Sequence, residues 1–257
     1  MRNIKLTIEY DGTNYQGWQI QRTKRGDAPT IQFALEQAIP RVVQHPVQVT
    51  GSGRTDSGVH AAGQVANFFT ESAIPAENLI PAINSYLPRD IAVVQAADVP
   101  LDFHARYSAK SKTYRYTVLN REARCPLLRD RVWHLRGRLE IDRMIAAARC
   151  LIGEHDFHAF QSKAAESEDG SSVRTVSQLD IAARDCLIEF TVSANGFLYN
   201  MVRAIVGTLV QVGYGRLQPD DVKRILDSHD RSQAGPTAPA KGLCLMAVYY
   251  EEDRSEK

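Results

Sequence analysis

Residues 47–69 have the sequence VQVTGSGRTDSGVHAAGQVANFF, and they form the predicted centre of the fold. Apolar residues that alternate at 47–50 and recur at 64–69 predict two short strands on either side of a glycine-rich loop. Within the loop, at 51–60, three glycines surround a single carboxylate, Asp56. Glycine permits positive φ and close approach of another molecule. Two interpretations fit equally: a catalytic loop at a strand end, and a hairpin turn in which Asp56 bonds only its own backbone.

The segments around this pair of strands predict the rest of the first half. Alternation at 4–10 predicts a strand, and Thr30 is a good N-cap for a helix over 30–39. A second helix over 76–86 ends at the Leu-Pro step, and a strand follows at 91–97. The resulting order βαββαβ is that of a ferredoxin-like unit.

The second half repeats that order with little sequence identity. Its predicted strands and helices lie at 113–119, 142–151, 175–182, 187–194, 200–212, 219–226 and 243–250. We therefore expect an α+β protein with two ferredoxin-like (βαββαβ) halves, 1–107 and 108–257. Joining the halves edge to edge in one extended, mainly antiparallel sheet hides two sheet edges. That arrangement places helices on one side and a cleft between the halves.

Composition excludes several classes of protein. The chain has 257 residues, of which 44% are hydrophobic and 24% are charged, as in a globular protein. No apolar run approaches the roughly 20 residues of a membrane span, and the N-terminus lacks the apolar core of a signal peptide. The four cysteines form no CxxC pair, which argues against a zinc site or a disulfide framework. We expect a cytoplasmic protein.

Positive charge is concentrated in the middle of the sequence. The formal net charge is only +1, yet residues 106–149 hold twelve Lys or Arg and four Asp or Glu. Aromatic residues interleave with bases in part of this run, at 103–116, a pattern that suits base stacking and phosphate binding. A polyanion is therefore one expected partner; an ordinary solvated surface and an edge strand with a half-buried aromatic face are the alternatives.

Other short motifs of the chain are compatible with other chemistries. Asp56-Ser57-Gly58 matches the aspartic protease signature, but such sites need two carboxylates and no second triplet occurs, so a homodimer would have to supply the other copy. The loop is neither GxGxxG nor a Walker A sequence, so no nucleotide cofactor is expected. His155 and His158 lie within a Glu-His-Asp-Phe-His run that lacks a third ligand nearby, so no metal is expected. His60 and His104 are either acid–base groups or structural histidines.

The motifs taken together resemble the TruA family of tRNA pseudouridine synthases. The loop GRTDSGVH at 53–60 carries the resemblance most clearly. Further matching segments occur in family order: EYDG at 9–12, YQGWQ at 15–19, DFHAR at 102–106, YRY at 114–116, MVRAIVG at 201–207 and GL at 242–243. The resemblance covers residues 9 to about 248, which is almost the whole chain.

The resemblance implies an enzyme that isomerises uridine to pseudouridine at positions 38, 39 and 40 of the tRNA anticodon arm. It places the catalytic aspartate at Asp56 and the tyrosine that stacks on the target base at Tyr114. It makes Arg203 the basic partner of the aspartate, Arg54 a loop arginine that opens and holds the RNA, and Leu243 an apolar residue of the pocket. It also implies a homodimer of doubled ferredoxin-like subunits, with a central RNA-binding cleft and no metal or cofactor.

One segment departs from the family pattern, and one other class of protein competes. Residues 22–29 form a longer insert than the family leads us to expect, which leaves the RNA contacts there open. An RNA-binding module without chemistry would also carry two ferredoxin-like units with tyrosines that stack on bases. Such a module has no use for a lone carboxylate beside phosphates, because like charges repel.

Overall fold

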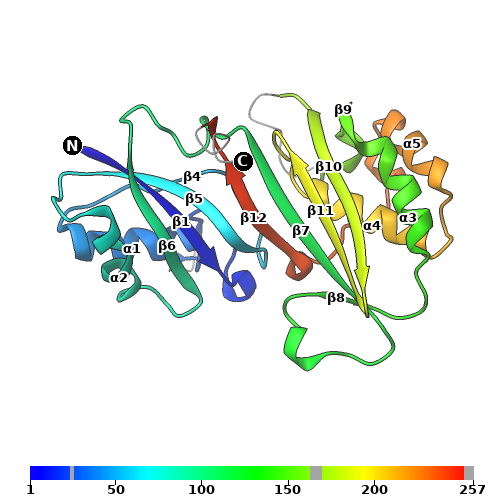
Figure 1. The fold of residues 1–257 in the computed structure, drawn as a ribbon, viewed down its shortest axis with the longest axis horizontal. Coiled ribbons are helices and arrows are strands. Elements are labelled where there is room, and N and C mark those ends of the chain that lie inside the picture. Colours follow the sequence, from blue (N-terminus) through cyan, green and yellow to red (C-terminus); the bar gives the residue numbers. More distant parts are fainter. Residues whose placement is uncertain (24–25, 163–169, 252–257) are drawn as a thin grey trace. The chain divides into compact units, whose positions relative to one another are not determined.

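The computed structural model describes residues 1–23, 26–162 and 170–251, which form two compact units. The first unit comprises Met1–Lys110 and the segment from Leu245 onward, and the second comprises Ser111–Cys244. The main sheet of the first unit contains β1 (Arg2–Tyr10), β4 (Thr50–Gly51), β5 (His60–Thr70), β6 (Ile91–Val99) and most of β12 (Leu243–Tyr249). They lie in the order β6-β1-β5-β12, with β4 on β5 (Figure 1).

The alternating pattern of β1 produces the core of the first unit. Ile4, Leu6 and Ile8 are fully buried on one face of the strand, and β1 pairs antiparallel with both β5 and β6. Helices α1 (Ile31–Val43) and α2 (Ala76–Asn84) pack on each other, and α2 packs on β6. Thr30 caps α1 as predicted, since its Oγ1 accepts the Phe33 amide hydrogen bond at 3.3 Å.

The strand predicted at 47–50 is wrong for all but its last residue. Only Thr50 and Gly51 pair with β5, in register with Asn67 and Ala66. The backbone of Val49 finds partners on helix α1 instead, where Glu36 Oε1 accepts from its N–H (2.9 Å) and Gln32 Nε2 donates to its carbonyl (3.1 Å). These side chains satisfy the backbone groups that a strand ladder would otherwise satisfy.

The second unit has its own antiparallel strands and a helical layer. Its strand order is β7-β11-β10-β9, with β8 parallel to β7. The helices α3 and α5 pack together, and α3 also contacts α4 and β10. The elements are β7 (Ser111–Asn120), β8 (Trp133–Leu135), α3 (Ile141–Ala148), β9 (Gly153–Asp156), β10 (Val173–Arg184), β11 (Leu187–Ala194), α4 (Met201–Gly213) and α5 (Pro219–Ser228).

The predicted α+β class with mainly antiparallel strands is confirmed. The helices and the longer strands follow one another along the chain in the predicted order, and the β10–β11 hairpin turns at Asp185, whose φ is 53°. Strands β8 and β9 were not predicted. The division of the chain differs from the predicted 1–107 and 108–257, because the last strand from Leu245 packs with the first unit.

Hydrogen bonds from β12 and its flank explain that correction. Tyr250 donates its hydroxyl hydrogen to the Ala105 carbonyl at 2.7 Å, and both groups are buried. The Lys110 amide donates to the Tyr249 carbonyl at 2.9 Å, and the Lys5 ammonium lies 5.5 Å from the Tyr250 ring centroid. The chain therefore returns to the first unit at its end.

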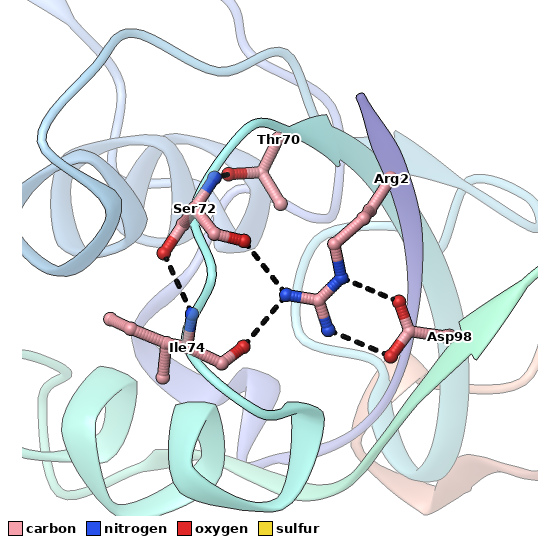
Figure 2. A network of polar contacts seen from close by, with 5 residues as sticks. All are labelled: Arg2, Thr70, Ser72, Ile74 and Asp98. Carbon is pink, nitrogen blue, oxygen red and sulfur yellow. Dashed lines mark hydrogen bonds and ion pairs between the residues drawn. The ribbon is translucent and has the colours of Figure 1, made fainter.

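An arginine at the start of β1 ties three segments of the first unit together (Figure 2). Two nitrogens of Arg2, Nε and Nη2, each donate to a different carboxylate oxygen of Asp98 on β6 at 2.7 Å. A third nitrogen, Nη1, donates to the carbonyls of Ser72 and Ile74 at 2.8 Å. This guanidinium fixes the connection between β5 and α2 to the ends of β1 and β6.

No helix among the described residues is long and apolar enough to cross a membrane.

The insert at 22–29 contains a short antiparallel ladder between β2 (Arg22–Thr23) and β3 (Gly26–Asp27), while Lys24 and Arg25 lie outside the described residues.

Candidate active site

Asp56 lies on the loop that joins β4 to β5 in the first unit. The loop spans residues 52–59, and Asp56 is partly exposed while its neighbours Thr55 and Val59 are buried. Arg54 is exposed on the same loop. The loop therefore contains both buried side chains, which anchor it, and side chains that are exposed to solvent.

The end of β1 and the loop that follows it, residues 10–18, form hydrogen bonds with the Asp56 loop. The hydroxyls of Tyr10 and Thr55 are hydrogen-bonded at 2.8 Å in the interior. The Trp18 amide donates to the Thr55 carbonyl at 3.1 Å, and the Tyr15 carbonyl accepts from the Gly58 amide at 3.2 Å. Backbone groups on both sides of Asp56 are therefore fixed by a segment some 40 residues earlier in the chain.

Two glycines make this close contact possible. At Gly17, whose φ is +87°, an added Cβ would lie 2.4 Å from the Thr55 carbonyl oxygen. At Gly12 an added Cβ would lie 2.0 Å from the Val59 carbonyl oxygen. Only glycine can occupy these positions without a backbone shift. The sequence showed both glycines among aromatic residues, but their contact with the Asp56 loop was not predicted.

The start of the loop is held by a buried polar pair. Ser52 Oγ donates to Gln64 Oε1 at 2.6 Å, and Gln64 Nε2 donates to the Gly53 carbonyl at 3.1 Å. Both side chains have no exposed surface. Buried polar groups that are fully paired in this way restrict a loop to one conformation.

His60, at the end of the loop, has a structural role in this geometry. Its ring is 2% exposed, and its Nδ1 accepts a hydrogen bond from the Gly12 amide at 3.1 Å. The same Nδ1 lies 3.1 Å from Asp11 Oδ1, an ion pair that requires a protonated ring. The Gly12 bond requires Nδ1 without a hydrogen, whereas a hydrogen bond to Asp11 requires Nδ1–H, so the two contacts belong to different hydrogen placements on the ring.

His104 is likewise engaged with backbone. Its Nδ1 accepts hydrogen bonds from the amides of Arg106 (3.2 Å) and Tyr107 (3.3 Å), and its ring stacks on Tyr107 at a centroid distance of 4.3 Å. These contacts support the structural interpretation of both histidines.

Among the described residues there is no cluster of three or more His, Cys, Asp or Glu arranged to hold a metal ion.

The remaining predicted site residues lie in the second unit. Tyr114 is on β7 opposite Val192 of β11, and its ring meets Phe197 edge to face at a centroid distance of 5.1 Å. Only 9% of Tyr114 is exposed. The Phe197 contact restrains the plane of the tyrosine ring.

Arg203 is held at the start of helix α4. Its Nε donates to the Ala238 carbonyl at 2.7 Å, and its Nη1 donates to the side-chain oxygen of Asn200 at 2.6 Å. Asn200 precedes the helix with a left-handed φ of 62°. The guanidinium is therefore oriented by two partners of its own unit.

Leu243 is the first residue of β12 and is 6% exposed. The preceding Gly242 lies against a tyrosine ring, because an added Cβ would be 2.5 Å from Cζ of Tyr116. Tyr116 donates its hydroxyl hydrogen to the Pro239 carbonyl at 2.8 Å, and burial raises the pKa of this phenol well above its usual value. The tyrosine is thus a neutral structural group that fixes the approach to Leu243.

The site residues therefore fall into two groups. Asp56 and Arg54 share one loop of the first unit, whereas Tyr114, Arg203 and Leu243 belong to the second. In each group, packing or hydrogen bonds restrain the segments that carry these residues.

Comparison with known proteins identifies the class. A family model described as tRNA pseudouridine synthase matches residues 6–108 and 147–251. The chain belongs to this family, and because pseudouridine synthases catalyse an isomerisation, it is an isomerase. The family assignment also decides against the aspartic protease interpretation of Asp56-Ser57-Gly58.

The alignments with individual relatives extend over nearly the whole of this chain. Proteins named tRNA pseudouridine synthase A from Thermoanaerobacter sp. (strain X514) and from Acetivibrio thermocellus are 52% and 46% identical to this chain. Each alignment covers 97% of the chain and 100% of the relative. Among solved structures, a Cbf5-Nop10-Gar1 complex is similar with a TM-score of 0.40 and 10% identity, over 96% of this chain and 50% of the other.

Proposed function

We propose that the protein converts uridine to pseudouridine at positions 38, 39 and 40 of the tRNA anticodon arm, with Asp56 as the catalytic carboxylate. The observation that carries the proposal is the Asp56 loop, in which a partly exposed carboxylate stands between anchored Thr55 and Val59. Membership of the tRNA pseudouridine synthase family supports the reaction, and the names of the relatives support tRNA as the substrate.

The reaction accounts for the residue types. The N1–C1′ bond of uridine breaks, the base turns, and a C5–C1′ bond forms, with a proton lost from C5 and one gained at N1. A carboxylate serves this isomerisation by attack at C1′, by removal of a ribose proton or by addition to C6. All three routes need an ionised Asp56 beside the base.

The other site residues are proposed to bind the substrate. Tyr114 stacks on the target base once that base has left the helical stack, and stacking returns part of the unstacking cost of a few kcal/mol. Arg54 and Arg203 supply positive charge for the RNA, and Leu243 provides an apolar contact. We also propose a homodimer that acts in the cytoplasm, as the family resemblance implies.

Substitution of Asp56 tests the proposal most directly. We expect Asp56→Asn to lower the rate of tritium release from 5-tritiated uridine in tRNA at least about a thousandfold, as loss of an essential nucleophile does. Binding of tRNA should stay within several-fold, because the change is nearly isosteric. The measurement is single-turnover release with an unmodified transcript, followed by mapping of pseudouridine.

The matched control is Ser57→Ala in the same loop. The Ser57 hydroxyl is exposed and donates only a 3.2 Å hydrogen bond to the Tyr15 carbonyl. This variant should retain nearly full activity. Near-normal release by Asp56→Asn would sink the assignment of the carboxylate, and equal loss in both variants would mean that loop geometry is responsible instead.

A further inference from the structure

A basic arm projects from the second unit between strand β7 and helix α3. The arm is defined as residues 121–138 and includes β8 (Figure 1). It holds six arginines and only two acidic residues. All six arginines are exposed: Arg121, Arg124, Arg129, Arg131, Arg136 and Arg138. Six of the twelve Lys and Arg residues at 106–149 thus lie on this one projecting segment.

The base of the arm is held firmly. Strand β8 pairs in parallel with β7, and the Arg121 amide donates to the Leu135 carbonyl at 3.2 Å. Asn120 Nδ2 donates to the Gly137 carbonyl at 2.7 Å. From the helical layer, the Tyr214 hydroxyl donates to the Arg136 carbonyl at 2.6 Å. These bonds give the arm a defined conformation before any partner arrives.

Two arginines are used to shape the tip. Nε of Arg121 donates to the Ala123 carbonyl at 2.8 Å. Arg129 pairs through Nε with Asp130 at 3.0 Å and donates from Nη1 to the Pro126 carbonyl at 3.3 Å. Their guanidinium groups are therefore partly committed to the arm itself.

Three other arginines are available to a partner. The guanidinium groups of Arg124, Arg136 and Arg138 form no hydrogen bond or ion pair with any residue in the described part of the chain. Elsewhere in the same unit, Arg143 is paired with Glu140 at 3.6 Å. Unpaired guanidinium groups on an ordered, positively charged segment are suited to bind phosphate groups, which they contact in bidentate fashion.

The tip also carries an apolar side chain. Leu127 lies in the short helix η2 (Pro126–Leu128) and is 93% exposed. A large aliphatic side chain held in water by an ordered turn gains free energy when a partner covers it. The tip therefore combines charge with an apolar contact.

We propose that the basic arm binds the sugar–phosphate backbone of the RNA substrate outside the target nucleotide. Arg124, Arg136 and Arg138 neutralise phosphates, and Leu127 packs against the RNA surface. The inference rests on the proposed function for the identity of the RNA. Charge complementarity selects a polyanion rather than a protein surface as the occupant. Such contacts position the RNA and carry no sequence information.

The test compares two triple variants of equal charge. Arg124→Gln, Arg136→Gln and Arg138→Gln are combined in the first. The control combines Arg149→Gln, Lys223→Gln and Arg224→Gln, which are exposed residues of η3 (Arg149–Leu151) and α5. Binding of an unmodified tRNA transcript is measured over a series of KCl concentrations, together with single-turnover pseudouridine formation at saturating RNA.

The arm variant should bind about tenfold or more weakly near physiological salt, with a log K against log salt slope reduced by about two, since each lost phosphate contact accounts for roughly 0.7–0.9. Its single-turnover rate at saturating RNA should equal that of the wild type. The control should change neither the slope nor the rate to a comparable extent.

The results that would overturn the role of the arm differ from the result that would overturn the proposed function. An unchanged slope in the arm variant, or an equal change in the control, overturns the proposal. A changed sedimentation coefficient of the RNA-free arm variant would assign the arm to contact with a second copy of the chain and overturn it too. If the wild type binds the transcript but forms no pseudouridine, the proposed function fails, while the salt slopes still decide the role of the arm.

Leu127→Ser separates the apolar contact from charge. The substitution changes no charge, so we expect Kd to rise several-fold while the salt slope stays the same. An unchanged Kd would remove Leu127 from the proposed surface, and a changed slope would show that the substitution had disturbed the arginines instead.

Discussion

Gly17 lies directly against the backbone of the Asp56 loop. It adopts a φ of +87° and allows the 11–18 loop to approach the Thr55 carbonyl. The neighbouring Trp18 amide then donates to that carbonyl at 3.1 Å. A methyl group at position 17 would have to displace the backbone of residues 55–57, so the position of the carboxylate depends on the absence of a side chain.

We expect Gly17→Ala to lower stability and activity together. The Cβ at 2.4 Å from the Thr55 oxygen forces a backbone shift, and the positive φ adds about 1 kcal/mol or more of strain. The free energy of unfolding should fall by roughly 2–4 kcal/mol, in the range of severe backbone and packing changes. Chemical denaturation and single-turnover kinetics measure the two effects.

Gly170→Ala is the matched control. Gly170 also has a positive φ, +65°, but an added Cβ there would meet no atom within 4 Å among the described residues. It should therefore show only the strain of the left-handed conformation and keep full activity. If both variants behave alike, the contact with Thr55 is not what positions Asp56.

The sequence identifies Asp56 as a candidate site residue, but it does not predict the hydrogen bonds that hold the Asp56 loop in place. Glycine spacing around a lone carboxylate marks the loop, and the family motif gives the carboxylate a role. The support consists of backbone hydrogen bonds, such as that from Gly58 to Tyr15, which depend little on side-chain identity. No local pattern encodes which of two distant loops will meet.

The network around Arg2 joins strands β1 and β6 to the connection between β5 and α2. Hydrogen bonds from Arg2 hold the pKa of Asp98 below its usual value, with its positive charge acting in the same direction. A depressed pKa means that the pair contributes stability above the pKa of the unfolded carboxyl group. The contribution disappears as pH falls through the lower pKa of the folded state.

Asp98→Asn should therefore have a pH-dependent effect. At pH 7 we expect the variant to be less stable by about 1 kcal/mol or less, because both side chains are partly exposed and solvent screens the pair. The difference should shrink as pH falls below the usual titration range of aspartate, because the wild-type carboxyl then also becomes neutral. Urea denaturation at a series of pH values provides the measurement.

Asp102→Asn supplies the comparison for this prediction. Asp102 is exposed in the same unit and forms no ion pair or hydrogen bond among the described residues. Its substitution should leave stability unchanged across the same pH range. A constant difference for Asp98→Asn at all pH values would show that the ion pair is not the source of the effect.

The sequence predicted helices and strands correctly where the residues within an element carry the signal for it. Alternation places the buried face of β1, and the Thr30 side chain starts α1. The segment at 47–50 fails because side chains of α1 satisfy the backbone of Val49. That competition is a tertiary effect, and the alternation of apolar residues alone cannot reveal it.

The chain passes between the two units twice. It enters the second unit at Ser111 and returns to the first at Leu245. The return is secured by the buried hydroxyl of Tyr250, which donates to the Ala105 carbonyl. The C-terminal strand is therefore a structural part of the unit that carries Asp56.

Tyr250→Phe tests the division of the chain. Loss of the hydroxyl leaves the buried Ala105 carbonyl without its partner, at a cost of about 1–3 kcal/mol. Hydrogen exchange followed by mass spectrometry should show faster exchange in β5 and β12, while α3 and α5 keep their protection.

The control is Tyr249→Phe. Tyr249 is 41% exposed, so removal of its hydroxyl should alter neither unit. Faster exchange in α3 and α5 of the Tyr250 variant would contradict the assignment of the C-terminal segment to the first unit.

The repeated βαββαβ pattern predicted two halves but misplaced the last strand between them. By pattern alone, the strand at 243–250 completes the second repeat. Its assignment to the first unit depends on contacts such as that between Tyr250 and Ala105, which are 145 residues apart. Periodicity carries no information about pairings of that range.

The return of β12 has a consequence for synthesis on the ribosome. Strand β5, which begins where the Asp56 loop ends, has β12 as a neighbour in the first unit. Because domains fold as their residues emerge, the first unit cannot be completed until residues 245–250 have been synthesised. We expect a chain that is terminated before residue 245 to lack the β12 neighbour of β5 and, under the proposed function, to leave RNA unmodified.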